Sequence, residues 1–349
     1  MYLSNVGVRT VFGGIEDTAA AYRCGLSLMT ELEDWPYFNE EQKEENYIVG
    51  FPAAGISSHF DSLGRYLKLF SAGFQDFVEE NVKRSYGRSI DCLYLLINDE
   101  SQFFMFPDFK NKFLKLAASI SNNSFELDEN FKVFSANNQN VSQLISLAQQ
   151  ELNDGKYNQV VIGVVDSLLD SERLKGLIKE NQIKTDDNPV GKMPGEASVF
   201  LALTSTSSDY SVRIYPGAYG QVVGEDPKEI ENNKMSGAIL TEVILKCFSS
   251  LPEADNEFGT LYSDFTGAPI EAHELSNSLT RISGKKPSVN NWFRAFPATC
   301  FGDVGESSAL LYAALAYQAY KRNYQTGNGS MILSQSDSLN RIAIALEKT

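Results

Sequence analysis

The fold of this chain is set by the stretch Tyr157–Leu203, which reads YNQVVIGVVDSLLDSERLKGLIKENQIKTDDNPVGKMPGEASVFLAL. It opens with an almost continuous apolar run, Val160–Val165, which is typical of a strand buried on both faces. A short amphipathic segment, Leu168–Ile178, and a polar loop with Asn-Pro and Pro-Gly turn signals follow. A second apolar run, Ala197–Leu203, closes the unit. We therefore expect two central strands joined through this loop.

Composition limits what the protein can be. Its 349 residues suffice for one large two-lobed domain or two ordinary ones, and 43% apolar content is typical of a folded protein. A net charge of −15 argues against nucleic acid and anionic membranes as partners, because both require clustered Lys and Arg. No apolar run is long enough to span a bilayer, and the first residues lack the order of a signal peptide.

Cysteine usage indicates the compartment. Cys24, Cys92, Cys247 and Cys300 lie far apart and show no metal-binding spacing. We therefore expect reduced thiols in a cytoplasmic protein, with no metal and no cofactor.

Strand-like and helix-like segments alternate along the rest of the chain, which favours an α/β fold with mixed, mostly parallel sheets. Residues 1–206 and 207–349 repeat one order of elements, so we expect two duplicated halves within one compact unit. Each half ends in adjacent strands without a helix between them, which indicates an added antiparallel strand. Strands are expected at Gly7–Gly14, Tyr47–Phe51, Cys92–Asn98, Phe131–Ala136, Tyr210–Val223, Phe258–Phe265, Trp292–Phe296, Met331–Ser334 and Ile342–Leu346.

Helices are expected between these strands, from apolar residues at helical spacing. The acidic and aromatic segment Glu31–Asn46 is interpreted as a surface excursion, and Asn122–Asn130 as a polar loop. The expected helices cover Ile15–Met29, Phe60–Phe77, Phe109–Ile120, Val141–Leu152, Leu240–Phe248, Ile270–Ile282 and Gly305–Lys321.

Three motifs in this order resemble a known family. They are GVVDSLLD at Gly163–Asp170, NPVGKMPGEA at Asn188–Ala197 and CFGDVGESSALLYAALA at Cys300–Ala316. Together they are similar to the thiolase fold in its β-ketoacyl synthase branch. The resemblance implies five layers, α-β-α-β-α, with the two sheets enclosing shared helices.

The same resemblance places a degenerate catalytic site. Ketosynthases carry a nucleophilic cysteine at the start of the helix that precedes the strand corresponding to Val160–Val165. Here the equivalent residue is Asn138. Their two histidines correspond to Thr266 and Asp303, and the glycine-rich turn between their last two strands is replaced by Ser334–Ser338. With these features missing, the resemblance implies a protein without ketosynthase activity. The remaining weak binding pocket would be lined by Asn138, Asp264, Thr266, Asp303, Glu306 and Ser336.

Other groups near this place allow alternatives. Cys300 precedes a helix start, where a thiolate is favoured, but it also fits as a small apolar residue ending a strand. The carboxylates of Asp264, Asp303 and Glu306 either converge to bind a cation or do acid–base work, or have a structural use, with Asp303 and Glu306 capping a helix N-terminus. His59 and His273 lie outside both histidine motifs and are interpreted as surface or packing residues.

A narrower resemblance concerns function. The segments AYRCGLSLM (with Arg23 and Gly25), Val165–Leu177 and Ala298–Ala309 are similar to degenerate ketosynthase-like proteins encoded beside type VI secretion effectors. This implies an accessory or chaperone-adaptor that binds a secreted effector or its adaptor. A homodimer through an edge strand at Phe131–Ala136 is also implied. The alternative is an acyl-thioester-binding protein or acyltransferase with an altered site.

Overall fold

The computed structural model describes residues 1–39, 42–53, 55–83, 90–98, 108–121, 130–208, 211–251, 258–335 and 339–349. The predicted loop Asn122–Asn130 lies outside these ranges except for its last residue. Among the described residues, no helix is both long enough and apolar enough to cross a membrane.

The first half of the main sheet has the strand order β5-β4-β6-β7-β1. The pairs β4–β5 and β4–β6 are parallel, whereas β7 runs antiparallel to both of its neighbours. The strands span Tyr2–Arg9 (β1), Cys92–Ile97 (β4), Phe131–Ser135 (β5), Gln159–Ser167 (β6) and Glu196–Thr204 (β7).

The second half repeats this arrangement with the order β11-β10-β12-β13-β8, and β9 pairs with β13 as well. The pairs β10–β11 and β10–β12 are parallel, whereas β13 runs antiparallel to β12, β8 and β9. The halves join where β1 pairs with β8. The strands span Val212–Ile214 (β8), Ala218–Gln221 (β9), Phe258–Ser263 (β10), Phe293–Ala295 (β11), Gly329–Ser334 (β12) and Asn340–Lys348 (β13).

The predicted strands β6 and β7 form the centre of the first half, and their register explains a glycine. Gly163 pairs with Phe200. A Cβ at Gly163 would lie 2.5 Å from the Phe200 ring, which itself packs against Phe70, Phe74 and Phe77. The glycine therefore leaves space for an aromatic cluster on the outer face of the sheet.

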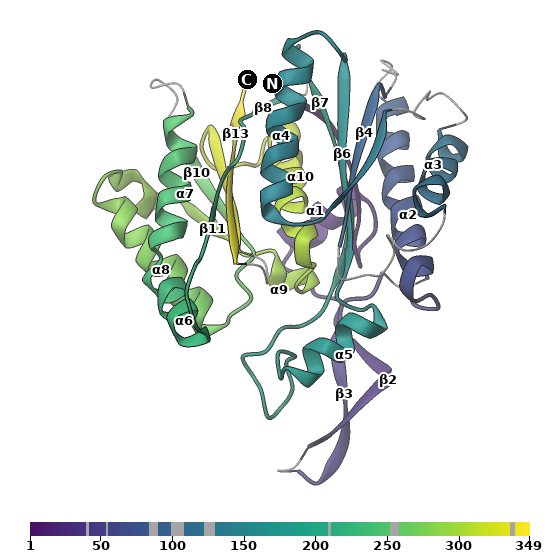
Figure 1. The fold of residues 1–349 in the computed structure, drawn as a ribbon, viewed down its shortest axis with the longest axis vertical. Helices are drawn as coiled ribbons and strands as arrows, with labels where there is room; N and C mark the ends of the chain where they lie inside the picture. Colours follow the sequence, from purple (N-terminus) through teal and green to yellow (C-terminus); the bar gives the residue numbers. More distant parts are fainter. Residues whose placement is uncertain are drawn as a thin grey trace.

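Five layers are visible in Figure 1, with helices outside each half-sheet and between them. A central hydrophobic cluster surrounds α1, α4 and α10, and separate clusters lie under α2 and α3 and under α7 and α8. The layered α/β architecture with duplicated halves is therefore confirmed. The helices span Ile15–Arg23 (α1), Ser62–Lys83 (α2), Phe109–Ile120 (α3), Asn138–Asn153 (α4), Ser171–Lys179 (α5), Pro227–Ser236 (α6), Ala238–Ser249 (α7), Pro269–Ser283 (α8), Ala298–Phe301 (α9) and Ser308–Lys321 (α10).

Several details differ from the predictions. The sheet is mixed, but parallel pairing is confined to β4 and β10 with their neighbours, so it is not mostly parallel. The first strand begins at Tyr2 rather than Gly7, and the first helix ends at Arg23 rather than Met29. Helix α6 was not predicted, because none of its residues is buried and it therefore shows no apolar periodicity. The features of its sequence that favour a helix are Asp226, which caps its N-terminus, and Pro227 in its first turn.

The segment interpreted as a surface excursion is a β-hairpin, β2 (Thr30–Asn39) paired with β3 (Glu44–Gly50), which projects from the body in Figure 1. One face packs against α5 through a small cluster that includes Ile48, Leu174 and Ile183. Asp186 accepts hydrogen bonds from Asn39 Nδ2 and Asn46 Nδ2, each at 2.8 Å. Apolar packing and this carboxylate therefore order the hairpin.

Candidate functional site

The predicted nucleophile position lies at the start of α4, as expected. Asn137 caps this helix, accepting a 2.7 Å hydrogen bond from Asn140 N. Asn138 is fully buried, and its Nδ2 donates to the carbonyl oxygens of Ser334 at 3.2 Å and Asn340 at 3.4 Å. Its amide therefore joins the start of α4 to the ends of β12 and β13.

Asp264 reaches the same place from the end of β10. Its Oδ2 accepts hydrogen bonds from Ser334 Oγ and Gln335 N, both at 2.7 Å. Two of the predicted pocket residues, Asn138 and Asp264, are thus brought together through Ser334. Ser336 lies outside the described residues.

A buried ion pair that local sequence patterns do not predict supports the chain where β12 ends and β13 begins. Arg341 and Glu274 form a two-point contact, with Nε–Oε1 at 2.7 Å and Nη2–Oε2 at 3.0 Å. Arg341 Nη1 also donates to the carbonyl oxygens of Gln335 at 2.8 Å and Asn340 at 3.0 Å. The one available signal is an arginine directly before the apolar run of β13.

Thr266 occupies a different hydrogen-bonding arrangement. Its backbone N and Oγ1 both donate to Glu271 Oε2 at 2.9 Å, which ties the end of β10 to the first turn of α8. Burial raises the pKa of Glu271 above its ordinary value of 4.5, even though the Thr266 N–H favours the charged form. Thr266 therefore serves as a donor to a partly buried carboxylate.

Asp303 and Glu306 lie at the loop before α10. Asp303 Oδ1 accepts from Gly305 N at 2.8 Å, and its Oδ2 lies 3.2 Å from Lys192 Nζ. The backbone N of Glu306 donates to Asp166 Oδ2 of β6 at 2.8 Å. Asp303 therefore accepts from the first residue of the short 3-10 turn Gly305–Ser307, and Asp166 accepts from the next.

Two further buried ion pairs lie at the two ends of the segment that joins β6 to β7. Glu196, at the start of β7, contacts Arg65 Nη1 at 2.8 Å and accepts from Ser167 Oγ at 2.7 Å. Asp166 pairs with Arg173 of α5. These charges lie inside the protein because each has a partner.

The alternative nucleophile and the histidines take part in none of the hydrogen bonds described above. Cys300 is nearly buried in α9, and burial raises its pKa, which disfavours the thiolate. His59 and His273 are both exposed. Within the described ranges, no group of three or more His, Cys, Asp or Glu residues is placed to hold a metal ion.

Known proteins were compared with the chain. No family model and no curated protein matches its sequence. A ketosynthase from module 6 of the bacillaene synthase of Bacillus subtilis 168 superimposes with a TM-score of 0.71 at 11% identity, covering 100% of this chain and 72% of that one.

Two further structures cover this chain equally well. A type II PKS acyl-carrier protein in complex with its ketosynthase bound to the hexaketide gives a TM-score of 0.72 at 10% identity, covering 100% of this chain and 98% of that one. A ketosynthase in complex with its chain length factor from Xenorhabdus doucetiae gives 0.68 at 13% identity, with 100% and 98% covered. These identities establish the fold alone. The chain therefore has the thiolase-like fold of the ketosynthases.

Proposed function

We propose that this protein is a non-catalytic member of the ketosynthase-fold group and works by binding another protein. The observation that supports this best is the state of Asn138. Its side chain is fully buried and donates to two carbonyl oxygens at the place where the family resemblance puts a nucleophile. An amide is no nucleophile towards a thioester.

The neighbouring charges support the same proposal. Asp303 stands where the resemblance puts a histidine, and Asp264 lies beside Ser334. A carboxylate near a developing oxyanion opposes its negative charge rather than stabilising it. The hydrogen bonds that Asp264 accepts from Ser334 and Gln335 use this carboxylate within the protein, at the end of β12.

Intact-protein mass spectrometry tests the absence of acyl transfer. The protein, with the exposed Cys24 replaced by Ser to remove background labelling, is incubated with acetyl and octanoyl thioesters. We expect no adduct, and none after Asn138→Cys, because burial and the nearby Asp264 carboxylate disfavour a thiolate there. An adduct on the C24S protein would support the alternative, an acyltransferase with an altered site.

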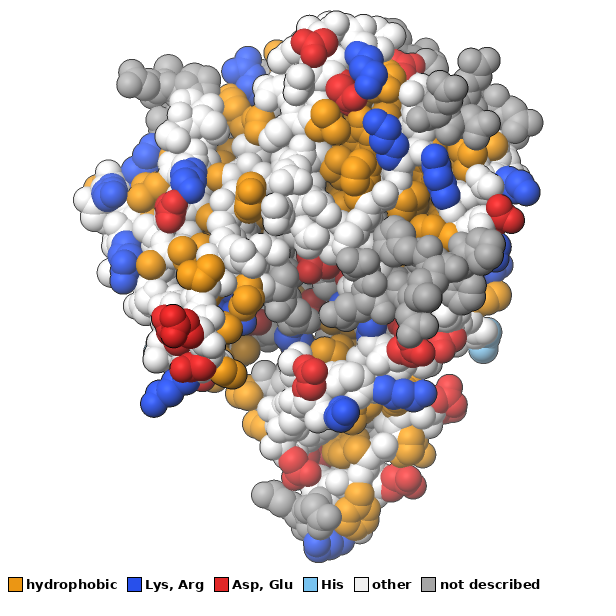
Figure 2. Space-filling model, viewed as in Figure 1, with side chains coloured by type: hydrophobic (Ala, Val, Ile, Leu, Met, Phe, Trp, Pro, Cys, Tyr) orange, Lys and Arg blue, Asp and Glu red, His pale blue; other side chains and the backbone are white. Residues whose placement is uncertain are grey.

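The partner we propose is a type VI secretion effector or its adaptor, as the narrower sequence resemblance implies. Two of the matched structures hold a ketosynthase together with a second protein. The hairpin offers a surface for such contact, since its two strands carry five carboxylates and no Lys or Arg. Phe38 and Tyr47 are exposed among these acids, and Figure 2 shows acidic and hydrophobic side chains on the projecting lobe. A basic partner surface would be complementary.

An affinity pull-down from the native organism tests this partner. We expect an effector or adaptor to be retained, and to be lost when Glu31, Glu33 and Glu45 are replaced by Lys. The matched control replaces the exposed Asp154, Glu225 and Glu231 by Lys, which gives the same change in charge away from the hairpin. Recovery of acyl-carrier or fatty-acid enzymes alone would contradict the proposal.

We also propose a dimer through β5, because this strand lies at the edge of the sheet. It is the last strand of the first half-sheet, with one neighbour among the described strands. Ala136 N donates to Ile97 O towards β4, and donors alternate along a strand, so Val133 N–H faces outwards. Val133→Pro removes an outer donor while sparing the β4 side. In sedimentation velocity we expect a dimer that becomes a monomer in this variant; a monomeric unmodified protein would contradict this.

A further inference from the structure

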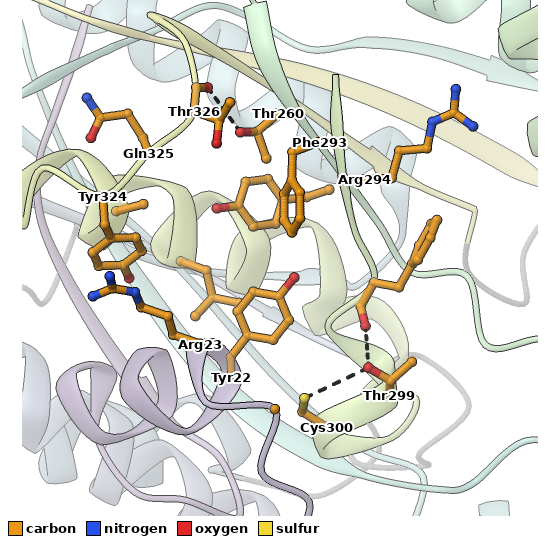
Figure 3. Close-up of a pocket in the computed structure, with 15 residues that line it drawn as sticks. Tyr22, Arg23, Thr260, Phe293, Arg294, Thr299, Cys300, Tyr324, Gln325 and Thr326 are labelled. Carbon is orange, nitrogen blue, oxygen red and sulfur yellow. Dashed lines mark hydrogen bonds between the residues drawn. The ribbon is translucent and has the colours of Figure 1, made fainter. Parts of the chain in front are cut away.

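A cavity of about 490 Å³, whose described lining residues do not include Asn138, lies between the end of α1, the strands β10 and β11, and α10. Aromatic rings make up much of its wall, as Figure 3 shows for Tyr22, Phe293 and Tyr324. Tyr262 and Phe296 add two more rings. A concave, mostly apolar site of this size with a few polar groups is typical of small-molecule binding.

The charges of this cavity are opposite to those of the protein. Arg23 and Arg294 line it, and none of its described lining residues is Asp or Glu, although the whole chain carries −15. The Arg23 guanidinium lies 4.4 Å from the centre of the Tyr324 ring, so it is already held at the wall. A local excess of guanidinium groups selects an anion.

The remaining polar groups of the cavity also favour a ligand that accepts hydrogen bonds. The hydroxyl of Tyr22 lies towards the interior of the cavity in Figure 3, and burial raises the pKa of Tyr22, so this hydroxyl stays a neutral donor. The Thr299 hydroxyl donates to Phe296 O at 2.8 Å and is thus used within the wall. Neutral O–H and cationic N–H donors together match a carboxylate.

We infer that this cavity binds a small aromatic carboxylate. The planar ring would lie among the aromatic side chains, where offset and edge-to-face contacts are favourable. The carboxylate would accept hydrogen bonds from the N–H edge of the Arg23 guanidinium, whose face is stacked on Tyr324, and from the Tyr22 hydroxyl, because the Arg294 guanidinium points away from the other lining side chains in Figure 3. This site is independent of protein binding at the hairpin.

Isothermal titration calorimetry with 2-naphthoate tests the inference, and 2-naphthamide is the neutral control of the same shape. We expect saturable one-to-one binding of the carboxylate and binding of the amide that is at least about tenfold weaker, the loss expected for a charge-assisted hydrogen bond. Arg23→Gln should weaken naphthoate binding by a similar factor. Arg281→Gln, at an exposed arginine of α8 outside the cavity, should leave it unchanged.

A second variant tests the place of binding. Thr299 is exposed at the cavity, so Thr299→Trp should fill the space and abolish binding, with thermal unfolding used to check that the variant folds. Absence of saturable naphthoate binding at millimolar concentration would overturn the inference. Equal binding of naphthoate and naphthamide, or naphthoate binding unaffected by both substitutions, would overturn it as well.

Discussion

Arg341 shows at the scale of one residue how the turn after β12 is held. Its side chain is buried with that of Glu274, and it also donates to two backbone carbonyl oxygens. A buried charge requires such partners, because its desolvation is unfavourable by several kcal/mol, as a rough estimate, when it is alone. Arg341 therefore supports the residues on either side of this turn, Gln335 and Asn340, through charge-assisted hydrogen bonds.

Breaking this pair should be strongly destabilising. Glu274→Gln leaves the buried guanidinium without a counter-charge, and we expect the free energy of unfolding to fall by about 3–5 kcal/mol. Glu242→Gln is the matched control, because the Glu242–Lys246 pair is exposed and should change stability by less than about 1 kcal/mol. Urea unfolding measures both, and equal effects would contradict the role given to Arg341.

The raised pKa of Glu271 predicts that the stability of the protein depends on pH. Its pKa is raised by burial, so the folded protein binds the proton more tightly than the unfolded chain does. The resulting stabilisation is complete below the ordinary value of 4.5 and is lost as the pH rises through the folded-state pKa. Glu271→Gln removes this titration, so its stability relative to the unmodified protein should be greater at pH 7 than at pH 4. Urea unfolding of both proteins at pH 4 and pH 7 measures this difference in stability. A larger relative stability of the variant at pH 4 than at pH 7 would contradict the prediction.

At the scale of elements, close approach of helix and strand determines where glycine is required. The backbone of α2 crosses β1 so closely that a Cβ at Gly7 would lie 2.3 Å from the backbone N and Cα of Phe77. Gly176 in α5 has nothing within 4 Å of its Cβ position. Neither requirement can be read from local sequence, because each depends on which element lies opposite.

These two glycines give a matched pair of substitutions. Gly7→Ala should destabilise the protein by about 1–3 kcal/mol or more, because α2 must move away from β1. Gly176→Ala should stabilise it by about 0.5–1 kcal/mol, since alanine favours an open helix position. Thermal and urea unfolding of both variants measure this, and destabilisation by Gly176→Ala would show that α5 has a neighbour there.

At the scale of the whole molecule, the central layer unites the two halves. Tyr317 of α10, from the second half, donates to Ser4 O of β1 at 2.9 Å, and both are buried. The central hydrophobic cluster includes residues of β1, β6 and β7 together with residues of β12 and β13. Neither half-sheet can expose this layer without loss of the other's core.

We therefore predict one cooperative unfolding transition, although the sequence predicts a division into the halves 1–206 and 207–349. Trp35→Phe leaves Trp292, in the outer core of the second half, as the one remaining tryptophan. Its fluorescence and the far-ultraviolet circular dichroism should then change at the same urea concentration. A separate fluorescence transition at lower urea would show that the second half unfolds alone.

The sequence alone determined the α/β class, the central strands β6 and β7 and the helix α10. These features follow from periodicity and turn signals among residues close in the chain, whereas the position of Asn138 at a helix start was implied by the family resemblance. The tertiary structure decided the ion pair of Arg341 with Glu274, the sharing of Ser334 by Asn138 and Asp264, and the cavity beside Arg294. Each of these joins residues far apart in sequence, and no local pattern specifies which side chains a folded chain brings within hydrogen-bonding distance.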